Sequence, residues 1–87
     1  SAYMITFAEF KFDLGKEAQI VYESLLPELS EDYQRTKAFL RLKDSSLVLN
    51  VEAYDIVSMR AALNGWLRLI KISHEMCSAV LDSYEIA

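Results

Sequence analysis

The sequence predicts an α+β fold in which two helices cover one face of a three-stranded antiparallel sheet. Three segments alternate apolar and polar residues, two others show helical spacing, and their order along the chain is β-α-β-β-α. With 87 residues, two glycines and one proline, the chain is expected to form one domain, residues 1–87, of regular elements with short connections.

The first strand is expected over residues 3–13, YMITFAEFKFD. Met4, Ala8, Phe10 and Phe12 share one face, which suits a core. The opposite face begins with apolar residues and ends with charged ones, so part of it is expected to be covered as well.

The first helix is expected over residues 16–26, with Asp13 as a candidate N-cap. Its core-facing stripe repeats at i, i+3, i+4 and i+7 spacing and consists of Ala18, Val21, Tyr22 and Leu25. Ile20 lies off this stripe and offers apolar surface outward. Pro27 ends or kinks the helix, and a polar connection follows.

The next two strands, residues 36–43 and 47–54, form the expected hairpin around Asp44 and Ser45. Alternation turns one face of each strand toward the core and leaves Val48 on the outward face. A right-handed first crossover that leaves a gap places the third strand between the other two, which gives the order 1-3-2. The first strand is then a long apolar edge, a kind of edge that is usually paired or protected.

A helix from Asp55 to about Asp82 dominates the chain, and Asp55 is a good N-cap for it. On a helical wheel its apolar residues cover most of the circumference, and only a narrow stripe is polar. One apolar arc holds Ile56, Met59, Leu63, Trp66, Leu67, Ile70, His74, Cys77 and Leu81. The arc continues through Ala62, Gly65, Leu69, Ile72, Met76 and Val80. The chain's own sheet can cover only one side of such a helix, so the other side is expected to contact a second molecule.

Composition narrows the classes of function. A net charge of −4, with 9 basic and 13 acidic residues, argues against a protein that grips nucleic acid alone. A hydrophobic content of 53% excludes a disordered chain. The single cysteine forms no internal disulfide, and neither a signal peptide nor a membrane span is recognised, so a cytoplasmic location without membrane contact is expected.

Residues that carry chemistry are sparse. His74 and Cys77 lie one helical turn apart, but a structural zinc site needs four ligands, and packing in a core or interface is the favoured interpretation. Most of the scattered carboxylates are expected on the solvated surface; the set is Glu9, Asp13, Glu17, Glu23, Glu28, Glu31 and Asp32. No phosphate loop or nucleophile motif occurs, so the sequence indicates a protein without catalytic residues, metal or cofactor.

Two polar patterns have open interpretations. Arg60, Asn64 and Arg68 recur at i, i+4 and i+8, which fits a solvated stripe slightly better than a row directed at a partner. A basic run on the second strand consists of Arg35, Lys37, Arg41 and Lys43. This run either protects an edge strand or contacts RNA phosphates within a larger assembly.

A known family pattern runs through Ala53-Tyr54-Asp55 and Arg60-Ala61-Ala62-Leu63-Asn64-Gly65-Trp66-Leu67-Arg68-Leu69-Ile70. Leu26-Pro27-Glu28 and Tyr33-Gln34-Arg35-Thr36 extend it upstream. The pattern resembles the Pcc-type family, small dimerising subunits of the KEOPS (EKC) complex that are related to cancer/testis antigens. The resemblance covers nearly the whole chain, although Gly65 stands where the family often has serine.

The resemblance implies two helices on a three-stranded antiparallel sheet. It also implies a non-catalytic subunit that dimerises, with itself or with a paralogue, and binds the actin-fold catalytic subunit of the complex. That enzyme transfers threonylcarbamoyl to the adenosine beside the anticodon of tRNAs reading A-starting codons. The family also carries a transcription label, but independent DNA binding is disfavoured by the acidic chain.

Both helices are expected to lay apolar residues against helices of the catalytic subunit, forming a helical bundle. The expected partner-binding residues are Ala61, Ala62, Gly65, Leu69, Ile72, Met76 and Ile20. Dimerisation is expected at the edge of the first strand and on the outward sheet face. The rival hypothesis is a stand-alone RNA-binding module whose open sheet face presents Phe7, Phe39 and Tyr54.

Overall fold

The computed structural model describes residues 5–30 and 35–86. Its single antiparallel sheet consists of β1 (Thr6–Asp13), β2 (Thr36–Lys43) and β3 (Ser46–Ala53). β3 lies in the middle, so the strand order is β1-β3-β2, as predicted. Leu49 of β3 pairs with Phe10 of β1 on one side and with Leu40 of β2 on the other.

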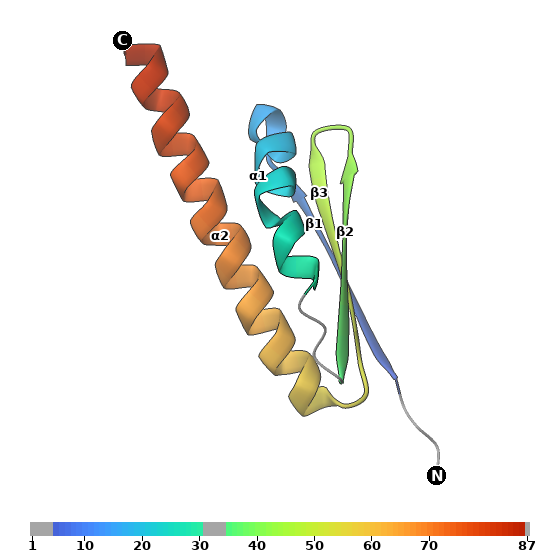
Figure 1. Ribbon diagram of the computed structural model, residues 1–87. Coiled ribbons are helices and arrows are strands. Elements are labelled where there is room, and N and C mark those ends of the chain that lie inside the picture. Colours follow the sequence, from blue (N-terminus) through green and yellow to red (C-terminus); the bar gives the residue numbers. More distant parts are fainter. Residues whose placement is uncertain (1–4, 31–34, 87) are drawn as a thin grey trace.

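Two α-helices and two short 3-10 helices complete the fold of the described residues. They are η1 (Gly15–Glu17), α1 (Ala18–Leu25), η2 (Leu26–Ser30) and α2 (Ile56–Ile86). Both α-helices lie on the same side of the sheet, and the C-terminal end of α2 extends beyond α1 and the strands (Figure 1). The predicted α+β class and the placement of both helices on one face are therefore confirmed.

The start of α1 is set by a turn at Gly15, whose φ of 59° is an easy conformation for glycine. The Gly15 backbone N donates to Oδ1 of Asp13 at 3.4 Å, so the chain first forms the 3-10 turn. The α-helix therefore begins at Ala18 rather than at residue 16. After Leu25 the chain tightens into η2, where Pro27 stands and a polar connection was expected.

The remaining element boundaries lie close to their predicted positions. β2 has the predicted bounds, and β3 is shifted one residue toward the N-terminus because Asp44 adopts a φ of 55° and shortens the turn. Asp55 caps α2 as predicted, since its Oδ1 accepts a hydrogen bond from the backbone N of Ser58 at 2.7 Å. β1 begins at Thr6, and the predicted strand residues Tyr3 and Met4 lie outside the described part of the chain.

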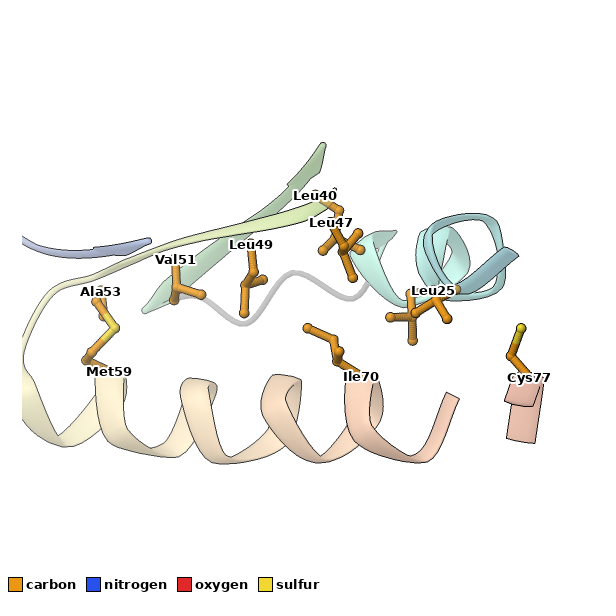
Figure 2. Packing of buried hydrophobic residues seen from close by; sticks show 10 residues of the cluster. Leu25, Leu40, Leu47, Leu49, Val51, Ala53, Met59, Ile70 and Cys77 are labelled. Carbon is orange, nitrogen blue, oxygen red and sulfur yellow. The ribbon is translucent and has the colours of Figure 1, made fainter. Parts of the chain in front are cut away.

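The core lies between the sheet and the two helices (Figure 2). Three residues of β3 are at its centre, with Leu47 and Leu49 fully buried and Val51 1% exposed. The buried cluster consists of Val21, Leu25, Leu40, Leu47, Leu49, Val51, Ala53, Met59, Ile70 and Cys77. Each large aliphatic side chain in it contributes about 1.5–3 kcal/mol by leaving water.

Some side chains differ from the alternation and wheel patterns, and three of them show why. Val48 is on the outward face yet only 2% exposed, because it lies in the central strand between the long side chains of Lys11 and Arg41. Phe10 is on the helix side yet 37% exposed, because α1 packs on β2 and β3 and α2 lies mainly over β3. Ile56, placed on the core arc, is 70% exposed because the first turn of α2 lies at the end of the sheet.

Candidate partner-binding site

A row of apolar residues on α2 faces away from the core. We call it the outer stripe, and it consists of Ala61, Gly65, Ile72, Met76 and Val80, which are all exposed. On a helical wheel these residues fall within an arc of about 100°. Ile72, Met76 and Val80 are 47%, 64% and 54% exposed, so neither the sheet nor α1 covers this side of the helix. The expectation that one short chain leaves part of α2 bare is confirmed.

The predicted partner-binding residues divide into two groups. Ala61, Gly65, Ile72 and Met76 are exposed on α2, and Ile20 is 46% exposed on α1. Ala62 and Leu69 are half-buried and pack against the core, because they lie on the side of α2 that borders the sheet. The solvent-facing part of the site is therefore narrower than the wheel predicts.

The polar stripe of Arg60, Asn64 and Arg68 is exposed along the flank of the outer stripe. None of these three side chains forms an ion pair or hydrogen bond with another described residue. Their donors are therefore free to face solvent or a partner, and the choice between these two interpretations stays open.

Glu17 holds the distal half of α2 against the start of α1. Its Oε2 accepts a hydrogen bond from Oγ of Ser78 at 2.6 Å and lies 2.7 Å from Nε2 of His74. The Glu17 side chain is only 14% exposed, so Glu17 is an exception to the expectation that most of the carboxylates are solvated. No sequence signal could have found this contact, because Glu17 and Ser78 are 61 residues apart.

His74 and Cys77 do not form a common site. His74 turns toward Glu17, whereas Cys77 is 8% exposed and belongs to the core. Burial, and to a lesser degree the charge of Glu17, raises the pKa of the Cys77 thiol, which makes it unreactive. Across residues 5–30 and 35–86 no three His, Cys, Asp or Glu side chains are placed to hold a metal ion.

Arg35 connects the start of β2 to the start of α2. Its Nη2 lies 2.5 Å from Oδ2 of Asp55, and its guanidinium carbon lies 6.0 Å from the centroid of the Tyr54 ring. The hydrogen bond from the Ser58 backbone, followed by that from Arg35, lowers the pKa of Asp55 from 3.8 to about 2. Arg35 is thus largely engaged within the chain, at the rim of an open hollow of about 120 Å³ that Lys37 and Glu52 also line.

The other three residues of the basic run, Lys37, Arg41 and Lys43, are exposed on β2. Alternation places them on the outward sheet face, opposite the helices. Sequence reasoning missed Lys11, which lies on the same face across Val48 from Arg41. The period-2 pattern of the first strand carried that signal, because it places Lys11 among the charged residues at the end of the outward face.

The described residues contain no helix that is both long and apolar enough to cross a membrane. The fold and the bare helix surface define a small α+β protein with two helices packed on one face of a three-stranded sheet. Its distinguishing surface feature is the outer stripe of α2.

The chain belongs to the Pcc1 family, because the family model described as "Transcription factor Pcc1" matches residues 7–78. A similar curated protein is described as KEOPS complex subunit Pcc1 from Pyrococcus abyssi (strain GE5 / Orsay). It is 39% identical over 57 residues, which cover 64% of this chain and 70% of the relative. The family resemblance inferred from the sequence is confirmed.

Proposed function

We propose that this protein is a non-catalytic scaffold subunit of a KEOPS-type complex. In this role it binds the catalytic subunit and supports threonylcarbamoyl modification of tRNA. The single observation that carries the proposal is the outer stripe of α2, which stays bare in the isolated chain. Family membership and the name of the Pyrococcus relative support the choice of a KEOPS-type complex.

The size of the bare stripe indicates how it would be used. Covering the exposed parts of Ile72, Met76 and Val80 would contribute about 2.5–5 kcal/mol, taking roughly half of a full side-chain burial for each. Association costs about 4–15 kcal/mol, so these three side chains alone are not sufficient. We therefore include Ile20 on α1 and close approach of a partner helix at Gly65 in the proposed interface.

Dimerisation belongs to the same proposal and is placed on a different surface. β1 is an edge strand, and Phe7 on its outward face is 71% exposed, with Ile5 just before the strand 50% exposed. Pairing at this edge with a second copy or a paralogue, together with contact on the outward sheet face, would cover both side chains. Light scattering at micromolar concentration tests self-association, and a strictly monomeric protein would contradict the homodimer.

The central experiment is a pull-down of the catalytic subunit with the double variant Ile72→Asp/Met76→Asp. Both side chains are exposed, so the isolated chain should stay folded while two carboxylates enter the interface. Leu69 is left intact because it packs against the core, and its replacement would report on folding instead. We expect capture of the catalytic subunit to be lost.

The matched control is Lys71→Asp, which changes the net charge by the same amount on the polar flank of α2. It should retain the catalytic subunit, and thermal melts should show that both variants fold. Capture by the double variant at the wild-type level would refute the proposed binding surface.

The rival function, a stand-alone RNA-binding module, has one observation in its favour. Phe7 and Phe39 are 71% and 49% exposed, and both lie on the outward sheet face. Glu9 and Glu52 share that face, and the chain is acidic overall, which disfavours tight binding without partners. A filter-binding assay with whole tRNA at physiological salt separates the two, since tight binding by the isolated protein would favour the rival.

A further inference from the structure

The most exposed part of the outer stripe lies on the half of α2 that has little sheet beneath it. Figure 2 shows Cys77 beyond all labelled residues of the sheet, and the C-terminal end of α2 extends past the strands in Figure 1. Met76 and Val80 are carried by this distal segment. A helical stretch shorter than about 12–15 residues is only marginally stable in water, so the segment depends on contacts outside the sheet.

Two polar contacts hold the distal segment from the side opposite the stripe. Oε2 of Glu17, on η1, accepts a hydrogen bond from Oγ of Ser78 at 2.6 Å and lies 2.7 Å from Nε2 of His74. We call these three residues the clasp. His74 and Ser78 are four residues apart on one side of α2, whereas Met76, between them in sequence, projects to the other side. The clasp therefore holds the segment without occupying the surface that a partner would cover.

The clasp is shielded from water. The Glu17 side chain is 14% exposed, and its hydrogen bond with Ser78 is partly buried. A hydrogen bond to a covered carboxylate is stronger than one in water, and its loss leaves covered polar atoms without a partner. Cys77 and Leu81, on the same segment, pack against the core, so polar and apolar contacts together seat it on α1.

We propose that Glu17 is a positioning residue for partner binding, because the clasp keeps residues 74–83 helical before the partner arrives. The partner then meets a preformed surface and does not have to order the groups that it covers, which is one of the costs of association. Without the clasp these residues fray in the free chain, and binding includes the cost of ordering them. The inference rests on the proposed binding of the catalytic subunit at the outer stripe, and it adds a determinant of affinity on η1, outside the covered surface.

Amide hydrogen exchange of the full isolated chain measures the order of the segment. Glu17→Ala should speed exchange of residues 74–83 roughly 10-fold relative to the amides of β3. Glu17→Gln keeps an oxygen that can accept from Ser78 and should stay close to the wild-type rate. Val51→Ala weakens the core at β3 and should show no such selective effect. Unchanged relative exchange in Glu17→Ala would overturn the inference.

Titration with the catalytic subunit measures the consequence for affinity. Glu17→Ala should raise Kd roughly 10-fold, whereas Glu17→Gln and the matched control Val51→Ala should bind nearly as tightly as the wild type. Ser78→Ala removes the same hydrogen bond from the α2 side and should also raise Kd. The combined variant should bind no more weakly than Glu17→Ala alone, because both changes act through one contact.

The two proposals fail in different ways. A wild-type chain that does not bind the catalytic subunit would refute the scaffold proposal and with it the binding role of Glu17. Normal binding by the wild type with an unchanged Kd for Glu17→Ala would refute the positioning role alone. If circular dichroism shows that Glu17→Ala does not fold, Ser78→Ala replaces it in both measurements, and wild-type behaviour of Ser78→Ala in either one would overturn the inference.

Discussion

Replacing Gly65 by alanine is expected to stabilise the isolated protein. Gly65 lies in the interior of α2 on the exposed side, and a Cβ built on it meets no atom within 4 Å. Glycine in such a position costs about 0.5–1 kcal/mol relative to alanine, because it loses more backbone entropy on folding. In a chain of this size that difference raises Tm by about 2–8 °C.

Thermal unfolding followed by far-UV circular dichroism measures the change. Ala61→Gly provides the mirror-image control, since Ala61 is exposed one turn earlier on the same stripe and should lose a similar amount. A Gly65→Ala melting temperature equal to or below that of the wild type would refute the reasoning, because it would mean that α2 is not an open, continuous helix at this residue.

The same position links stability to the proposed interface. If a partner helix approaches closely at Gly65, Gly65→Leu should fold normally but bind the catalytic subunit more weakly, since the added side chain separates the two backbones. Unchanged capture by Gly65→Leu would exclude close approach at this point. Gly65 would then lower the free energy of unfolding without contributing to binding.

Three further predictions concern polar contacts and the thiol. Glu17→Ala should destabilise the chain by about 1.5–3 kcal/mol in urea unfolding, because it removes the hydrogen bond from Ser78 and the contact with His74 at a largely covered carboxylate, whereas Glu23→Ala on the exposed side of α1 should change little. The pKa of Asp55 is lower in the folded state than in the unfolded state, so the ionised side chain stabilises the fold at any pH above the unfolded-state pKa. This stabilisation is lost as pH falls from about 4 toward 2. The Asp55→Asn variant should lack that pH dependence, which unfolding curves at several pH values will show. Cys77 should resist thiol reagents in the native protein and react once it is unfolded, as measured by labelling rates with and without denaturant.

The fold was largely predictable because its signals are local. Alternation over residues 36–43 and the capping side chain of Asp55 specify a strand and a helix start without reference to the rest of the chain. The strand order needed one additional rule, the handedness of the crossover. The start of α1 and the start of β3 differ from their predicted positions, because a positive φ at Gly15 and at Asp44 determines where each element begins.

The surface was less predictable because exposure depends on what lies opposite. A helical wheel gives Leu69 and Met76 the same apolar character, but only the packing shows that Leu69 touches the core and Met76 is bare. The carboxylate of Glu17 finds its partners far along the chain, and Arg35 looked like its basic neighbours until its pairing with Asp55 was visible. The roles of the outer stripe and of the basic run stay predictions until the experiments above are done.

The position of β3 has a consequence for folding during synthesis on the ribosome. β1 and β2 flank β3, which is the last of the described strands along the chain, so neither has its backbone partner until residue 53 has been translated. Until then the segments of β1 and β2 are unpaired and partly apolar in the nascent chain. The hairpin of β2 and β3 can close early, because it joins neighbours in sequence, and β1 then adds to its free side.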